Sequence, residues 1–290
     1  MANTSLAAPR TLLLAERRKA EDRYRRRLNR IFKEIEERLA GLTDPSEITA
    51  TLIAITNSPQ FDRLCKEATR QAVTLLAVGQ KATWRAASAA SSKGRIIYKA
   101  LKAETSNGVI GQTINNIVLE NANLIKSVPR DIARDFTQLA RDRYVQGIRP
   151  EQIAKEMQAK AAHLTKVEAK RIARTEASKA STALIQARAE AYDRPFYIWD
   201  SVSDERVRDS HRKMDGVICR WDDPPNPEVL AHEKRDYGPY HPGDIFNCRC
   251  HPHVIIALED IKFPAKIHVS GSIKTVQNLA QFKAAYGLAA

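Results

Sequence analysis

The chain has 290 residues, of which 43% are hydrophobic and 28% are charged, an ordinary composition for a globular protein with about two domains. No apolar run approaches the roughly 20 residues that span a bilayer, and the first residues lack the pattern of a signal peptide. These features exclude a membrane-spanning or secreted class and predict a protein made and kept in a cytoplasm, where four cysteines do not form a disulfide framework.

The net charge is +13 at pH 7. Such an excess of basic residues favours a polyanionic neighbour such as packaged nucleic acid, because neutralising phosphates releases counterions. A basic, solvated helical surface explains the same charge. Composition alone leaves both interpretations open.

The first predicted element is an amphipathic helix that ends near Gly41. Its apolar residues recur at steps of three and four, at Tyr24, Leu28, Ile31, Ile35 and Leu39. The cluster Arg25, Arg26 and Arg27 is a candidate contact for DNA or an acidic partner. Because acidic residues are interspersed, a solvated helix face is the alternative.

Further helices are expected up to about residue 126, with breaks near Asn57-Ser58-Pro59, Ser91 to Gly94 and Ser106 to Gly108. Two helices are then expected between residues 121 and 164, with Pro129 in the first turn of a helix that Gly147 ends. Thr165 and Glu168 have capping-box spacing, which predicts the start of a long helix running to about Tyr192.

The stretch from Pro195 to Ile256 differs from this helical pattern. It holds three of the four cysteines and five of the seven histidines. We predict a strand over 196–202, a short helix capped by Ser203, a turn at Asp215-Gly216 and a strand over 217–219. A long loop from 222 to 247 then leads to a last strand at about 253–256.

The rest of the chain is predicted to be irregular or a short strand over 257–269 and an amphipathic helix over 271–286. We therefore expect an α+β protein. Its segments are a helical N-terminal region (1–126), helices that lead onward (127–192), a small mixed domain of short strands and long loops (193–260) and a C-terminal helical tail (261–290).

A series of short motifs runs through the second half of the chain: Ala173-Arg174-Thr175-Glu176, Trp199, Asp204-x-Arg206 with His211, Asp215-Gly216, His241-Pro242-Gly243 and Asn247-Cys248-Arg249-Cys250. In this order they resemble the Mu protein F-like family of phage head morphogenesis (minor capsid) proteins, over roughly residues 120–256. The resemblance implies a virion component near the portal vertex, with portal or major capsid protein as partner. Packaged double-stranded DNA is a further partner in this interpretation, and a membrane or a small-molecule substrate is not expected.

Most of these motif residues are expected to be architectural. An arginine presents a planar fork to a carboxylate and can pin a loop, a tryptophan can close a small core, and glycine and proline meet backbone requirements. The predicted structural network comprises Arg174, Glu176, Trp199, Asp204, Arg206, His211, Asp215, Gly216, Pro242, Asn247 and Arg249.

A structural zinc site is a second hypothesis for the same stretch. Cys219, Cys248 and Cys250, with a histidine such as His241, offer the thiolate and imidazole ligands that suit tetrahedral Zn²⁺. Cys-x-Cys is tighter than the usual zinc spacing, so the alternative is that the cysteines pack as small buried side chains.

An enzyme is the remaining class. His211, His241, His251 or His253 with Asp204, Asp215 or Asp244 would provide a base for metal-dependent, nuclease-like hydrolysis. No spacing here matches a nuclease motif, and the ordered elements of ADP-ribosyl transfer are not found. We therefore expect a structural and interaction protein without catalytic residues, with the nuclease-like enzyme and a plain DNA-binding module as alternatives.

Overall fold

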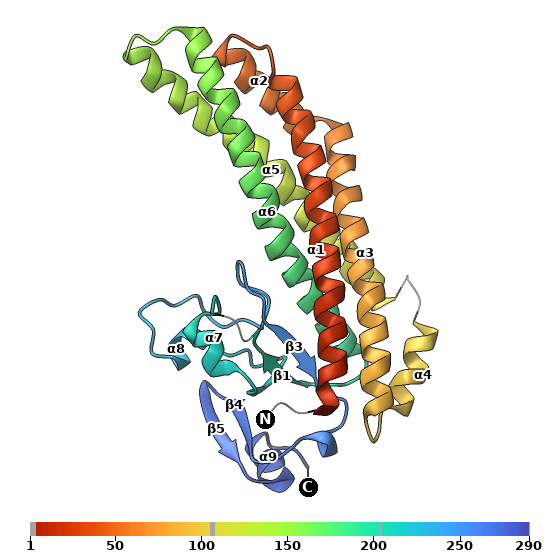
Figure 1. Ribbon diagram of the computed structural model, residues 1–290. Helices are drawn as coiled ribbons and strands as arrows, with labels where there is room; N and C mark the ends of the chain where they lie inside the picture. The colour runs from red at the N-terminus through yellow and green to blue at the C-terminus, as the bar shows by residue number, and fades with distance from the viewer. Residues whose placement is uncertain (1–3, 105–107, 203–204, 290) are drawn as a thin grey trace. The chain divides into compact units, whose positions relative to one another are not determined.

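The computed structural model describes residues 4–104, 108–202 and 205–289. Helices fill the first two thirds of the chain: α1 (Thr4–Leu39), α2 (Pro45–Asn57), α3 (Pro59–Ala90), α4 (Arg95–Ala103), α5 (Val109–Val145) and α6 (Pro150–Ala191). The later elements are short: β1 (Phe196–Asp200), α7 (Asp209–Met214), β2 (Ile218–Arg220), α8 (Pro227–Leu230), β3 (His251–Val254), the 3₁₀ turn η1 (Leu258–Asp260), β4 (Ala265–Val269), β5 (Ser272–Val276) and α9 (Leu279–Ala285). This is the expected α+β class (Figure 1).

The chain divides into two compact units that are discontinuous in sequence. The helical unit comprises residues 19–74 and 114–177, and the sheet unit comprises residues 1–18, 75–113 and 178–290. No helix within the described ranges is long and apolar enough to cross a membrane.

The core of the helical unit is built on the predicted face of α1. Tyr24, Leu28 and Ile35 are buried there and pack with Phe136 of α5 and Ile172 of α6. Burying such side chains contributes about 1.5–3 kcal/mol each. The expected stop at Gly147 is confirmed, because its positive φ of 73° lets the chain leave α5.

Two helix boundaries predicted here are wrong. Pro129 lies inside α5 and not in a first turn, because Ile125 and Ile132 keep the same buried face on both sides of it. Thr165 lies in the middle of α6 and caps nothing. Its hydroxyl lies 2.7 Å from the Glu36 carboxylate and 3.0 Å from the Ala161 carbonyl one turn back, and these acceptors satisfy a threonine inside a helix.

The sheet unit contains, in the described part of the chain, a five-stranded sheet of order β3-β1-β2-β4-β5. β1 pairs antiparallel with β2 and β3, β2 pairs parallel with β4, and β4 pairs antiparallel with β5. Alternate residues of β1 enter different cores, since strand side chains alternate between faces. Phe196 packs with Phe282 of α9, whereas Tyr197 and Trp199 face the core that holds the cysteines.

The C-terminal segment is not the single helix predicted over 271–286. β4 and β5 form a hairpin whose two-residue turn, Ser270-Gly271, has positive φ at both positions (47° and 74°). The helix α9 is confined to Leu279–Ala285. The prediction failed because Ile273 and Val276, three residues apart, also fit a strand that ends at a buried residue.

A buried ion pair joins α6 to the end of α4 in the sheet unit. Arg188, only 1% exposed, donates from Nε and Nη2 to the Glu104 carboxylate at 3.0 and 3.1 Å, and Nη2 also donates to the Ala77 carbonyl. Burial raises the pKa of Glu104, but the hydrogen bonds and charge of Arg188 outweigh it and hold that pKa below its ordinary value. The buried charge of Arg188 is therefore neutralised by Glu104 while that carboxylate is ionised.

We expect Glu104→Gln to lower the free energy of unfolding by about 3 kcal/mol, because the change leaves the Arg188 charge buried without its counterion. Urea denaturation at pH 7 measures this loss. The matched control is Glu156→Gln, which breaks the more exposed Arg143–Glu156 pair at 2.7 Å and should cost much less. Equal losses in the two variants would contradict the role given to Arg188.

Candidate functional site

The candidate site lies on the face of the sheet to which β1 directs Tyr197 and Trp199. Helix α7 brings His211 to this face, and the loop before β3 brings Cys248 and Cys250. His211 Nδ1 lies 3.5 Å from Cys248 Sγ and 3.4 Å from Cys250 Sγ. All three side chains are buried, and the Trp199 ring stands edge-on to the imidazole with centroids 5.4 Å apart.

A chain of hydrogen bonds fixes the other side of the imidazole. The Tyr240 hydroxyl donates to the Glu228 carboxylate at 2.7 and 2.8 Å and lies 2.9 Å from His211 Nε2. Because its one proton goes to Glu228, the Tyr240 oxygen accepts from Nε2–H. The imidazole then presents a lone pair at Nδ1 to the two sulfurs.

The two thiols differ in acidity. The hydrogen bond from Cys250, together with His211, holds the pKa of Cys248 well below its ordinary value against the effect of burial. The same hydrogen bond with Cys248, together with burial, raises the pKa of Cys250. The hydrogen bond between the two sulfurs therefore makes Cys248 the more acidic thiol of the pair.

Arg17 of α1 holds the backbone of the Cys-x-Cys segment. Its Nη1 donates to the Cys250 carbonyl at 3.0 Å, and its Nη2 donates to the Arg249 carbonyl. Arg17 is 8% exposed, so these carbonyls satisfy a guanidinium that is largely out of water. No sequence signal identified Arg17, Glu228 or Tyr240, since none of them stands in a motif and Arg17 is more than 200 residues away from the cysteines.

The predicted zinc set of Cys219, His241, Cys248 and Cys250 does not come together. Among the described residues, the cluster with metal-ligand spacing is His211, Cys248 and Cys250. His241 instead lies 2.9 Å from the Tyr197 hydroxyl through Nδ1, and Cys219 interacts with that same tyrosine. The prediction missed this because His211 was assigned to a loop-pinning network, and sequence spacing does not show which histidine reaches the loop.

His241, Tyr197 and Cys219 form a second cluster, and their side chains are uncharged near neutral pH. Burial lowers the pKa of His241 to about 4, and burial also raises the pKa of the Cys219 thiol. Burial raises the pKa of Tyr197 well above its ordinary value, so its hydroxyl keeps its proton in the hydrogen bond with the neutral His241 Nδ1. Trp221 packs tilted against Tyr197 and edge-on to His241, with ring centroids 4.4 Å and 5.0 Å apart.

Several residues of the predicted structural network have backbone roles. The Asp215 carboxylate accepts from the Ser201 amide at 2.8 Å, and Gly216 takes a φ of 79° in the following turn. The Pro242 carbonyl accepts from the Thr182 hydroxyl at 2.6 Å. Arg249 supplies a carbonyl to Arg17, as described above.

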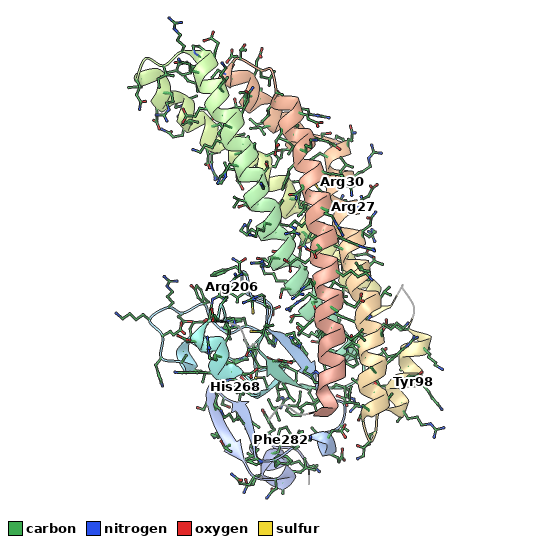
Figure 2. The ribbon with its side chains drawn as sticks, viewed as in Figure 1. Arg27, Arg30, Tyr98, Arg206, His268 and Phe282 are labelled. Carbon is green, nitrogen blue, oxygen red and sulfur yellow. The ribbon has the colours of Figure 1, made fainter. Side chains whose placement is uncertain are left out.

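The other members of that network are spread over both units. Asn247 is exposed with a φ of 55°, and Arg206 is exposed on the loop before α7 (Figure 2). Arg174 pairs with Glu21 at 3.5 Å in the helical unit, to which the buried Glu176 also belongs. Asp204, together with the predicted cap Ser203, lies outside the described residues.

The histidines considered for catalysis are buried. His251 lies 1% exposed with Nε2 at 3.1 Å from the Asp200 carboxylate, and His253 is 8% exposed on the same strand. Asp244 is largely buried, and burial raises its pKa to about 7. These groups contact other parts of the sheet unit.

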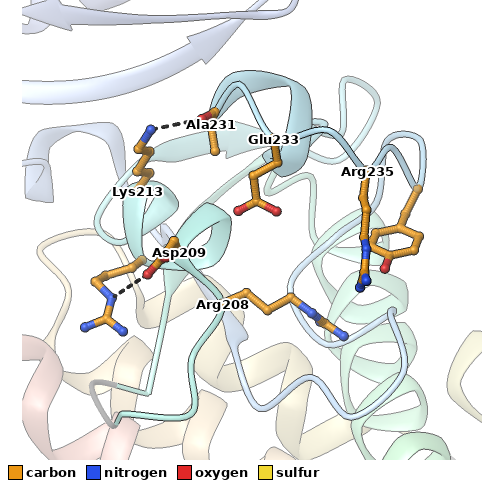
Figure 3. Close-up of a pocket in the computed structure, with 8 residues that line it drawn as sticks. Arg208, Asp209, Lys213, Ala231, Glu233 and Arg235 are labelled. Carbon is orange, nitrogen blue, oxygen red and sulfur yellow. Dashed lines mark hydrogen bonds and ion pairs between the residues drawn. The ribbon is translucent and has the colours of Figure 1, made fainter.

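A solvent-open pocket of about 800 Å³ lies beside α7 and the loop that follows α8 (Figure 3). Lys213 donates to the Ala231 carbonyl there, and Arg212 pairs with Asp209 at 3.7 Å. Arg208 lies over the Phe246 ring at 4.7 Å. The lining comprises Arg208, Asp209, Arg212, Lys213, Ala231, Glu233, Arg235 and Tyr237, so four basic side chains meet two acidic ones.

The arginine cluster of α1 lies in the helical unit. Arg25 and Arg26 are exposed and Arg27 is half-buried (Figure 2). Arg25 donates to Asp22 at 3.0 Å, so part of the charge of the cluster is neutralised within the helix.

Comparison with known proteins points to one family. Residues 135–252, which contain His211, Cys248 and Cys250, match the family described as "Phage Mu protein F like protein". A relative from Haemophilus influenzae (strain ATCC 51907 / DSM 11121 / KW20 / Rd), described as "Uncharacterized protein", is 33% identical over 144 residues. The match covers 49% of this chain and 29% of that relative, so the chain spans less than a third of the curated relative it matches. No solved structure matches the chain.

We expect His241 to destabilise the sheet unit as the pH drops from about 6.5 to about 4. The unfolded histidine takes up a proton in this range, whereas the buried His241 ring stays neutral, so its protonation favours unfolding by up to about 3 kcal/mol. The buried Asp244, whose pKa is raised to about 7, acts in the opposite direction, so the His241 contribution is the difference between the wild type and His241→Gln in urea unfolding at several pH values. The stability of the wild type relative to His241→Gln should fall over this range, and NMR titration of the ring should show the low pKa. A His241 ring that titrates near pH 6.5 would contradict its burial.

Proposed function

We propose that this chain, which belongs to the Mu protein F-like family through residues 135–252, is a minor head protein of a tailed bacteriophage that acts in head morphogenesis. The observation that carries the proposal is this family match, because it covers the end of α5, all of α6 and the chain from there to the start of β3. Its expected location is the virion head, after assembly in the host cytoplasm.

The burial of the chemical groups supports an architectural role. His211, His241 and His251 are each less than a tenth exposed, and their ring nitrogens face protein groups. A nuclease-like enzyme needs a base and a metal that a phosphodiester can reach. The arrangement therefore supports side chains that hold loops together more than side chains that act on a substrate.

Exposed apolar side chains on the helices are the proposed contacts with portal or major capsid protein. Ile96 of α4 is 77% exposed and Val145 at the end of α5 is 90% exposed. Burying such apolar area against a partner would strengthen an interface, although single exposed apolar side chains are also common on protein surfaces. In this proposal they become buried when the chain joins the head.

We expect mass spectrometry of purified particles to find this chain in the heads of the phage that encodes it, in lower copy number than the major capsid protein. Pull-down with the purified chain should retain portal or major capsid protein, and Val145→Glu should weaken that retention because it places a charge in the contact. Val145 is almost fully exposed, so its replacement should leave folding unchanged by circular dichroism. Particles that lack the chain, with normal heads formed in its absence, would overturn the proposal.

The basic pocket beside α7 is the proposed contact with packaged DNA. It combines four basic side chains with the aromatic ring of Tyr237 on an open surface. Phosphates bind such cations with a strong dependence on salt. The Arg25, Arg26 and Arg27 cluster is the alternative contact.

We expect the double variant Arg212→Glu/Arg235→Glu to weaken binding to double-stranded DNA and to reduce the slope of log affinity against log salt by about two. Fluorescence anisotropy across a salt series measures both quantities. The matched comparison is Arg25→Glu/Arg26→Glu, which changes the same charge in the helical unit and should leave the slope near the wild-type value. The opposite pattern would move the contact to α1, and no effect in either variant would remove DNA from the partners.

A further inference from the structure

The geometry of His211, Cys248 and Cys250 suits a tetrahedral metal ion. Zinc binds thiolate sulfur at about 2.3 Å and imidazole nitrogen at about 2.0–2.1 Å, which puts neighbouring nitrogen and sulfur ligands about 3.6 Å apart. The two nitrogen-to-sulfur distances here are 3.5 and 3.4 Å. The three ligand atoms all lie within 4.8 Å of one another, so a single ion can contact them together.

The groups around the cluster orient it as metal ligands require. A metal-binding histidine usually donates its second ring N–H to an oxygen, which fixes the tautomer and aims the lone pair at the ion. Here Tyr240, itself held by Glu228, accepts from His211 Nε2–H, and Nδ1 faces the sulfurs. A histidine that only filled space would not need this buried carboxylate behind it.

The backbone around the cluster is held firmly. The Arg17 guanidinium donates to the Cys250 carbonyl at 3.0 Å and to the Arg249 carbonyl, so the segment that carries both sulfurs is fixed. The Trp199 ring covers the imidazole edge-on and keeps the cluster out of water. Two thiolates and a neutral imidazole around a divalent ion give a site of no net charge, which is the form that burial tolerates best.

We propose that His211 Nδ1, Cys248 Sγ and Cys250 Sγ bind one zinc ion, with a water molecule completing the tetrahedron. The sulfur and imidazole set favours zinc over magnesium or calcium, which prefer oxygen ligands. The ion links α7 to the loop before β3, and among the described residues no strand pairing joins these two segments. Its binding energy therefore stabilises the sheet unit. The site goes beyond the proposed head function and does not depend on it.

We expect the purified full-length chain to contain about one zinc per molecule by elemental analysis. Replacement of zinc with Co²⁺ should give thiolate-to-cobalt charge-transfer bands and the intense visible bands of a tetrahedral site. A chelator should lower the melting temperature, and added zinc should restore it. A chain that stays free of zinc after reconstitution, with a melting temperature that the chelator leaves unchanged, would overturn the proposal.

Two sets of variants locate the site. Cys248→Ser and Cys250→Ser should abolish the cobalt bands and most of the bound zinc. Cys219→Ser and Cys65→Ser, which change buried thiols outside the cluster, should keep both. Equal loss of zinc in Cys219→Ser would contradict the assignment.

A third variant remains informative even if the cysteine variants fail to fold. Tyr240→Phe keeps the ring but removes the oxygen that accepts from His211 Nε2–H, so zinc affinity should fall about 10- to 100-fold while binding remains measurable. Competition with a coloured zinc indicator measures the affinity. An unchanged affinity would show that the hydrogen-bond chain does not orient a metal ligand, and would overturn the proposed coordination by Nδ1.

Discussion

The two-residue period of β1 is the constraint on which the sheet unit depends. This five-residue strand pairs with both β2 and β3, so its backbone is held on both edges. Its side chains therefore divide between two cores, with Phe196 on the α9 side and Trp199 on the side of the cysteines. A slip of one residue in register would exchange the two sets, so the strand pairing and the candidate site specify each other.

The polar groups buried by this arrangement are satisfied by chains of partners from distant parts of the sequence. His211 reaches Glu228 through Tyr240, Arg17 reaches the backbone of residues 249 and 250, and Arg188 reaches Glu104. A buried polar group without a partner costs several kilocalories per mole, so each of these contacts fixes where its segment can lie. The loop from 222 to 250 has little regular structure. The hydrogen bonds of Tyr240, Glu228 and Arg17 hold it where backbone pairing between strands does not.

Periodic patterns carried most of what could be predicted from the sequence. The buried face of α1, from Tyr24 to Leu39, followed from its spacing, and the turn at Gly216 followed from the need for positive φ. Short patterns failed where two structures share them: Thr165 fits both a cap and a helix interior, and Ile273 with Val276 fits both a helix and a strand. The motif order indicated a resemblance to the family, and residues 135–252 match the family model.

The sequence predicted that cysteines and a histidine would form the candidate site, but it did not predict which histidine. Cys248 and Cys250 stand two residues apart, so the sequence alone placed them together. Both histidines lie on the same face of the sheet, so the choice between His211 and His241 depends on whether each ring packs beside Trp199 or beside Tyr197, and no local pattern records that. Arg17 shows the limit most clearly, because a residue in the first helix becomes a neighbour of Cys250 only through the tertiary fold.

The sheet unit separates the side chains of the candidate site from those of the basic pocket. Thiols, imidazoles and the Glu228 carboxylate lie inside, whereas Arg212 and Arg235 lie exposed on α7 and the loop after α8. His211 and Arg212 are consecutive on α7, so one turn of helix faces the cluster with one side chain and solvent with the next. Whatever fixes His211 in place also fixes the position of the basic pocket. The buried cluster thus sets the position of the basic pocket that is proposed as a partner contact, while its own side chains stay out of reach of any partner.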